Sequence, residues 1–211
     1  HISLIKKSIK ECKKTLVSIY INKPQFNNKK DFNKYPRVIN KDISLIKDSG
    51  IDYLYLPKTK ELYSKGINKK ININSFKNKL CGKFRKGHFE AVADVIDNYI
   101  KIIKPNKIFL GEKDMQQLKI IEDFVKRNHK NTKIVGCKIV REVNGIPYSS
   151  RNTLLSINEK IIASKVCKFI RSKKKIIIKN KKLIKSIMKE IYSFGVNKID
   201  YVELLDINKV I

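Results

Sequence analysis

Residues 107–128, KIFLGEKDMQQLKIIEDFVKRN, decide the fold class. The apolar run Ile-Phe-Leu ends at Gly111, which predicts a short buried strand. From Asp114 onward apolar residues return every three or four positions, the spacing of an amphipathic helix. A strand that ends in glycine and passes straight into a helix is the repeating unit of a parallel α/β sheet.

The segments on either side continue this alternation. Residues 88–105 carry one apolar stripe that Pro105 closes, which predicts a long helix, and residues 132–140 predict the next strand. The remaining expectations are a helix over 1–11, strands over 15–21 and 51–57, a helix stopped by Gly50, a short strand over 71–74, a hairpin at Asn144-Gly145, helices from 158 and a strand over 198–207. The chain therefore predicts an α/β domain over 1–140 with a mostly parallel sheet, and a smaller α+β domain over 141–211.

The charge balance has two interpretations. The chain has 211 residues, with 48 Lys and Arg against 19 Asp and Glu, a formal net charge of +29. Such an excess is typical of proteins that bind nucleic acid or anionic membranes. However, only six of the basic residues are Arg, and Ile and Asn are also abundant, as a genome poor in G and C would produce. We favour compositional drift, and we expect neither a nucleic-acid nor a membrane partner.

Membrane and redox signals are weak. No apolar run is long enough to cross a bilayer. The four cysteines form no C-x-x-C pair, and no histidine stands at zinc-finger spacing, so free thiols in a reducing compartment are expected. We therefore predict a cytoplasmic protein without a disulfide framework and without a metal held by protein side chains.

Polar residues gather at four boundaries between predicted elements. These clusters are His1, INKPQF (21–26), GEKDMQQ (111–117) and YSSRN (148–152). Because parallel sheets bind ligands beyond the carboxyl ends of their strands, the clusters are candidate site residues. They supply hydrogen-bond donors for a polyphosphate (His1, Lys113, Ser149, Ser150 and Arg151) and neutral amides (Asn22, Gln25 and Gln117).

The start of the helix near residue 114 suits phosphate, because its backbone N–H groups and the positive end of its dipole are unpaired. Lys113 adds a cation there, while Asp114 either caps the helix or holds a ribose hydroxyl. Gln116 and Gln117 cannot face the same way on a helix, so one of them should point into the site. Each cluster alone is more often a turn, a cap or a solvated side chain. Together they predict a nucleotide-using α/β enzyme.

The order of motifs resembles one family closely. The stretches HISLI, SIYINKPQF, DFNKYPR, FRKGHF, FLGEKDMQQL, VREVNG and SSRN follow each other as in the pantoate–β-alanine ligases of the nucleotidyltransferase superfamily. The resemblance implies a Rossmann-like domain whose first strand is missing upstream of His1 and a smaller C-terminal domain cut after Ile211. It also implies a homodimer.

The resemblance further implies an activity. ATP with Mg²⁺ would activate pantoate as pantoyl adenylate, and β-alanine would displace AMP to give pantothenate. The residues implied for ATP are His1, Gly111, Glu112, Lys113, Asp114, Val140, Tyr148, Ser149, Ser150 and Arg151, with His1, Lys113 and Arg151 catalytic; those implied for pantoate and β-alanine are Asn22, Gln25 and Gln117. The alternatives are a non-catalytic relative and a nucleic-acid-binding relative of the same fold.

Overall fold

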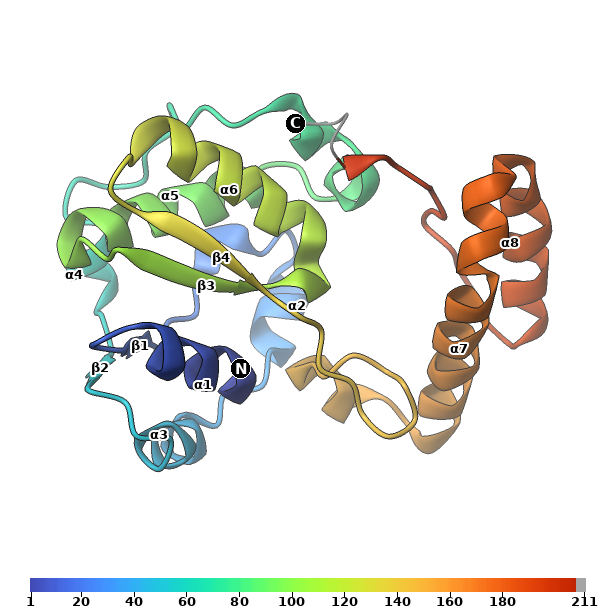
Figure 1. Cartoon of the computed structure of the whole chain (residues 1–211), viewed down its shortest axis with the longest axis horizontal. Coiled ribbons are helices and arrows are strands. Elements are labelled where there is room, and N and C mark those ends of the chain that lie inside the picture. Colours follow the sequence, from blue (N-terminus) through green and yellow to red (C-terminus); the bar gives the residue numbers. More distant parts are fainter. Residues whose placement is uncertain (208–211) are drawn as a thin grey trace. The chain divides into compact units, whose positions relative to one another are not determined.

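The computed structural model describes residues 1–207, which divide into two compact units (Figure 1). The first unit covers 1–138 and the second begins at Ile139, two residues before the start of the predicted second domain. The substrates assigned to each domain stay predictions.

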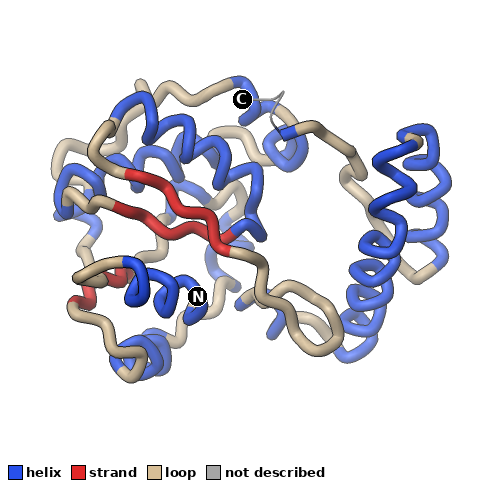
Figure 2. Tube along the Cα trace, viewed as in Figure 1, coloured by secondary structure: helices blue, strands red, loops and turns tan. Residues whose placement is uncertain are grey.

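Helices and strands alternate along the first unit (Figure 2). The elements are α1 (Ile2–Glu11), β1 (Leu16–Ser18), α2 (Lys29–Lys34), α3 (Ile39–Lys47), β2 (Tyr53–Tyr55), α4 (Thr59–Leu62), α5 (His88–Ile103), β3 (Lys107–Gly111), α6 (Met115–Asn128) and β4 (Lys133–Cys137). Short 3-10 turns cover 23–25, 75–78, 80–84 and 112–114. The predicted alternation is therefore present, although β1 and β2 are shorter than the predicted strands.

The described strands form two parallel pairs. In β1 and β2, Leu16 lies opposite Tyr53, and in β3 and β4 the register runs from Lys107 opposite Lys133 to Gly111 opposite Cys137. The parallel direction is the one predicted. Parallel strands need a crossover between them, and α6 provides it for β3 and β4.

The core of the first unit lies between α5, α6 and the second strand pair. The buried apolar side chains there are Phe89, Val92, Val95, Ile100, Leu118, Ile120, Ile121, Phe124, Val125 and Ile134. Burying each of the larger ones contributes about 1.5–3 kcal/mol. In β4, a Cβ at Gly136 would lie 3.3 Å from Leu118 Cδ2, so the glycine allows α6 to pack closely on the strand.

Residues 71–74 form no strand, so that prediction was wrong. The Asn74 side chain instead accepts a hydrogen bond from the Phe76 N–H and opens the turn over 75–78, and Phe76 is completely buried. The chain then folds back so tightly that a Cβ at Gly82 would lie 1.7 Å from the Lys77 carbonyl oxygen. Only glycine permits this return.

The second unit consists mostly of helices. A hairpin joins Arg141 to Pro147, with Gly145 in the left-handed region as the Asn-Gly pair predicted. A 3-10 turn (Ser150–Leu154) follows, then α7 (Ile157–Lys179) and α8 (Ile184–Ser193). Their core contains Ile177, Ile187 and Ile191.

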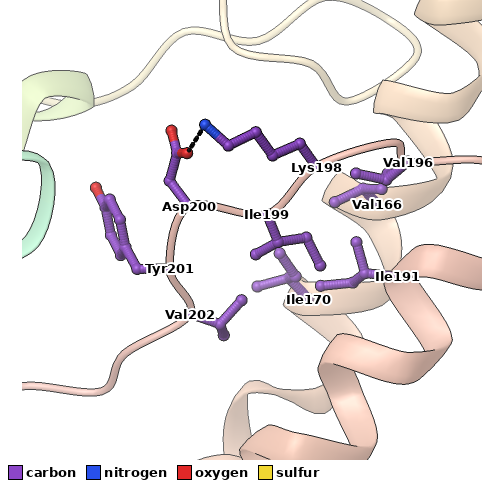
Figure 3. A pocket seen from close by; sticks show the side chains of 9 residues that line it. All are labelled: Val166, Ile170, Ile191, Val196, Lys198, Ile199, Asp200, Tyr201 and Val202. Atoms are coloured by element: carbon purple, nitrogen blue, oxygen red, sulfur yellow. Dashed lines mark ion pairs between the residues drawn. The ribbon is translucent and has the colours of Figure 1, made fainter. Parts of the chain in front are cut away.

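The predicted strand over 198–207 is not formed. Residues 198–206 are irregular, and Val196, Ile199 and Val202 pack on the α7–α8 core instead. Figure 3 shows this segment lining a shallow pocket with Ile170 and Ile191, while the Lys198 Nζ pairs with Asp200 Oδ1 at 2.9 Å. None of the predicted site residues lines that pocket. Among the described residues, no helix is long and apolar enough to span a membrane.

Candidate active site

The carboxyl end of β3 carries the first group of predicted site residues. Gly111 ends the strand, residues 112–114 form one 3-10 turn, and α6 begins at Met115. Lys113 is exposed, with its Nζ 3.6 Å from Asp114 Oδ2. The Asp114 side chain does not cap α6, so of its two predicted roles the cap is wrong. The first turn of a helix directs backbone N–H groups outward, which suits a phosphate.

Helix α1 brings His1 to the same end of the sheet. Near the end of the helix, Glu11 Oε2 lies 3.4 Å from the Nζ of Lys107, the first residue of β3. The Lys7 Nζ also donates to the Gly136 carbonyl on β4 at 2.9 Å. The helix therefore runs against β3 (Figure 1), and its ten residues carry the chain back toward the strand's carboxyl end. His1 stands there, exposed, with its carbonyl accepting the first hydrogen bonds of the helix.

The segment after β1, residues 22–25, is fixed against the start of α5. Asn22 is only 3% exposed; its Nδ2 donates to the Ala91 carbonyl at 3.1 Å, and its Oδ1 accepts from the Tyr63 hydroxyl at 2.7 Å. The Gln25 carbonyl lies 2.8 Å from Nδ1 of the buried His88. Because α5 ends just before β3 begins and packs against α6, its start also lies toward the carboxyl end of β3.

The two glutamines of α6 have different surroundings. Gln116 is buried, and its Nε2 donates to the Phe76 and Lys79 carbonyls at 2.8 and 2.7 Å. Its Oε1 accepts from the Cys81 thiol at 3.1 Å. Gln116 thus holds the 75–84 segment, while Gln117 is half-buried and its side chain has no hydrogen-bond partner among the described residues. Gln117 is therefore the glutamine available to a ligand.

The second unit carries the remaining predicted residues on its hairpin and the following turn. The Val140 carbonyl accepts from the Tyr148 N–H at 3.1 Å, and both side chains are exposed, Tyr148 by 60%. The Ser149 Oγ caps the next turn by accepting from the Arg151 N–H at 3.3 Å. Ser150 is half-buried and Arg151 is exposed on that turn. The catalytic roles implied for Lys113 and Arg151 stay predictions.

Sequence reasoning missed the side chains that support these segments. Tyr63, His88, Gln116 and Cys81 each bond to partners 35 to 63 residues away. Such partners leave no local pattern in the sequence. Asn152 stood within the quoted YSSRN cluster, but its bonds from Nδ2 to Glu142 Oε1 (2.6 Å) and to the Pro147 carbonyl (3.0 Å) were not predicted.

Burial keeps several of the supporting groups neutral. Desolvation raises the pKa of the Cys81 thiol, and it raises the pKa of the Tyr63 hydroxyl as well. Both groups therefore remain hydrogen-bond donors at neutral pH, and Cys81 has little thiolate character. Within residues 1–207, no group of three or more His, Cys, Asp or Glu side chains could hold a metal ion. The candidate site can position and neutralise anions through the exposed Lys113 and the start of α6.

Comparison with known proteins identifies the family of the chain. The profile of the family described as pantoate-beta-alanine ligase matches residues 1–210. The chain belongs to the pantoate–β-alanine ligase family. The pantothenate synthetase of Clostridioides difficile (strain 630) is 41% identical over 98% of the chain and 74% of its own length. That of Sulfurihydrogenibium sp. (strain YO3AOP1) is 38% identical over 99% of the chain and 76% of its own length.

Solved structures agree with this family assignment. The pantothenate synthetase of Thermus thermophilus superposes with a TM-score of 0.91 over 100% of the chain and 78% of its own length; at 24% identity it supports the fold. The pantoate-beta-alanine ligase of Francisella tularensis, complexed with beta-gamma ATP and beta-alanine, is 34% identical with a TM-score of 0.83, over 98% of this chain and 77% of its own length. The predicted Rossmann-like α/β fold and the predicted ATP-dependent ligase are confirmed. These relatives give no support to a non-catalytic or nucleic-acid-binding alternative.

Proposed function

We propose that this pantoate–β-alanine ligase works through a pantoyl-adenylate intermediate. A pantoate carboxylate oxygen attacks the α-phosphorus of ATP, and the bond to the bridging oxygen of the β-phosphate breaks to release pyrophosphate. The deprotonated amine of β-alanine then attacks the acyl carbon. The bond between that carbon and the AMP oxygen breaks, and AMP leaves as the amide forms.

The barrier to the first step is charge repulsion, because both reactants are anions. Preorganised cations and N–H groups at the transferred phosphate lower that barrier most effectively. We assign this role to His1 and Lys113, with Arg151 and the two serines of the second unit closing over the phosphates. Gly111, Asp114 and Val140 are assigned to the ribose and adenine, and Glu112 and Tyr148 complete the proposed ATP-binding set.

The pantoate pocket is assigned to Gln25 and Gln117, with Asn22 beside them. Amide side chains suit this substrate because each offers a donor for a carboxylate and an acceptor for a hydroxyl. A single observation supports the assignment most strongly. The segments that carry His1, Lys113, Gln117 and Gln25 converge on the carboxyl end of β3, although they are up to 116 residues apart in the chain.

We expect Mg²⁺ to arrive bound to the ATP phosphates. Magnesium is commonly held by phosphates and water with few protein ligands, and the described residues contain no cluster of three acidic, His or Cys side chains. No step above is assigned to the metal. A homodimer in the cytoplasm remains part of the proposal.

Exchange of radiolabelled pyrophosphate into ATP tests the intermediate. The full-length enzyme should catalyse this exchange when pantoate is present and β-alanine is absent, because forming the adenylate is reversible until the amine arrives. Exchange that needs another carboxylic acid in place of pantoate would contradict pantoate as the acid that is adenylated. Exchange that needs β-alanine would contradict a separate adenylate.

The two glutamines of α6 provide a matched pair of variants. Gln117→Ala should weaken pantoate binding about tenfold, because it removes one amide contact, and should leave ATP binding within about twofold. Gln116→Ala should instead lower the urea midpoint of unfolding, because it removes the donor of the buried Phe76 carbonyl and of the partly buried Lys79 carbonyl. Titration calorimetry with each substrate separates the two effects. Equal losses of pantoate and ATP affinity in Gln117→Ala would contradict its role.

A further inference from the structure

Asn22 connects three parts of the first unit through one buried amide. The amide nitrogen bonds to the Ala91 carbonyl on α5, and the amide oxygen accepts the Tyr63 hydroxyl, which follows α4. Asn22 itself belongs to the segment after β1. The Asn22 backbone carbonyl also accepts the Gln25 N–H at 3.2 Å, which closes the turn that carries Gln25.

The two hydrogen-bond partners of the Asn22 side chain allow only one orientation of its amide. The Ala91 carbonyl can only accept, so the Asn22 nitrogen must face it. The Asn22 oxygen is then directed at Tyr63, whose hydroxyl must donate. Burial raises the pKa of the Tyr63 hydroxyl, so it keeps the proton that this bond needs. Replacing this hydroxyl by hydrogen would leave the Asn22 oxygen buried without its donor.

Gln25 depends on this turn for its position. The Gln25 carbonyl is fixed by His88, and the Gln25 N–H is fixed by the Asn22 carbonyl. Pro24, the residue before Gln25, restricts the backbone of the same turn. The half-buried Gln25 side chain has no hydrogen-bond partner among the residues that the structure describes. The turn therefore presents this amide without using it.

We propose that Tyr63 is a positioning residue for pantoate: its hydroxyl orients the Asn22 amide, which sets the turn that presents Gln25 to the substrate. Tyr63 itself touches no substrate. This inference rests on the proposed assignment of Gln25 to the pantoate pocket. It predicts an effect on pantoate that ATP does not share, because the residues assigned to the phosphates lie just before α1, on the 112–114 turn and in the second unit.

The structure offers a matched control in Tyr99. This tyrosine is also half-buried, and its hydroxyl lies 2.7 Å from Ser18 Oγ on β1. Tyr99→Phe removes a bond of the same length between α5 and the β1 region without touching the 22–25 turn. Both variants lose a single hydroxyl, so a difference between them isolates the position of the bond rather than its strength.

Steady-state kinetics of the full-length enzyme test the proposal. Tyr63→Phe should raise the KM for pantoate about tenfold, with the KM for ATP within about twofold, and Tyr99→Phe should leave both KM values within about twofold. Thermal midpoints of both variants report any general loss of stability. Unchanged pantoate KM in Tyr63→Phe, or an equal rise in both KM values, would overturn the proposal.

A double variant provides a second test that does not depend on stability. If Tyr63 acts only through Asn22, then Tyr63→Phe added to Asn22→Ala should raise the pantoate KM no further than Asn22→Ala alone. Additive rises would mean that Tyr63 acts by another route and would overturn the mechanism. Wild-type enzyme without pantoate-dependent turnover would instead contradict the proposed function itself, so the two failures are distinguishable.

Discussion

Residues 22–25 and 149–154 are both turns fixed by an asparagine, but the two asparagines lie at different depths. Asn22 is buried beneath α5 and Tyr63, whereas Asn152 is half-buried and ties its turn to the neighbouring hairpin. The first turn is thus fixed by the core of its unit and the second by local contacts at the surface. The difference teaches that the turn proposed to bind pantoate is held by buried contacts, while the predicted residues of the second unit lie on a turn held at the surface.

Removing an exposed cation should have the largest effect and should test whether the surface turn takes part in catalysis. Arg151→Ala and Lys113→Ala should each lower kcat about a hundredfold or more, because each removes charge stabilisation at the transferred phosphate. Their thermal midpoints should stay near that of the wild type, because both side chains are exposed. Steady-state turnover and a melting curve measure the two properties.

Lys126 and Arg171 are matched controls for these substitutions. Both are exposed basic residues, Lys126 near the C-terminal end of α6 and Arg171 on α7, outside the predicted site segments, so their alanine variants should keep wild-type turnover. If Arg151→Ala were as active as Arg171→Ala, the second unit would contribute no cation to the reaction. The proposed catalytic role of the 149–154 turn would then be wrong.

The different burial of the two asparagines should give different losses of stability when each is replaced by alanine. Asn22→Ala removes a partner from the buried Ala91 carbonyl and from the half-buried Tyr63 hydroxyl, and it should lower the free energy of unfolding by about 2–3 kcal/mol. Asn152→Ala should cost about 1 kcal/mol, because water can replace its partners at the surface. Urea unfolding followed by circular dichroism measures both. Equal losses would contradict the difference in depth.

A buried acid on α5 should produce the smallest effect. Burial raises the pKa of Asp94 above its ordinary value of 3.8, although the Asn68 N–H at 3.1 Å opposes the shift. Because the folded-state pKa is the higher one, the unfolded chain loses its proton first, and stability falls as pH rises from 3.8 through the folded-state value. Asp94→Asn should therefore raise the free energy of unfolding at pH 7 by about 1 kcal/mol or less.

The pH dependence separates this effect from a simple change in packing. The gain in the free energy of unfolding from Asp94→Asn should shrink as pH falls and disappear below 3.8. There the Asp94 carboxyl of the wild type is neutral in both the folded and the unfolded chain. Urea midpoints between about pH 3 and 8 would show this trend. A gain that does not change with pH would point to packing instead of charge.

Segments with a clear periodicity were predictable from the sequence. The apolar stripe of α5, the strand that ends at Gly111 and the Asn144-Gly145 hairpin all form where their local patterns indicated. In these segments local preference and tertiary packing favour the same structure, so local reasoning was sufficient. The site segments at the start of α6 and after β1 were located in the same way.

Segments fixed by distant partners were not predictable. Residues 71–74 alternate as a strand does, but they pair with no described strand, and the chain turns at Asn74 because the Phe76 N–H bonds to its side chain. Nor could the sequence say which glutamine of α6 faces inward. The Phe76 and Lys79 carbonyls that engage Gln116 lie 40 and 37 residues earlier in the chain.

The tight return at Gly82 has a genetic consequence. Any side chain at position 82 would collide with the Lys77 carbonyl and displace the 75–84 loop. Gln116 bonds to a carbonyl of this loop and directly precedes Gln117 on α6, so the displacement would reach Gln117. Alleles altered at codon 82 should therefore behave as auxotrophs with poor substrate use, although the mutated residue meets no substrate. In a complementation screen, second-site mutations elsewhere in the 75–84 loop should restore growth to strains that carry such alleles.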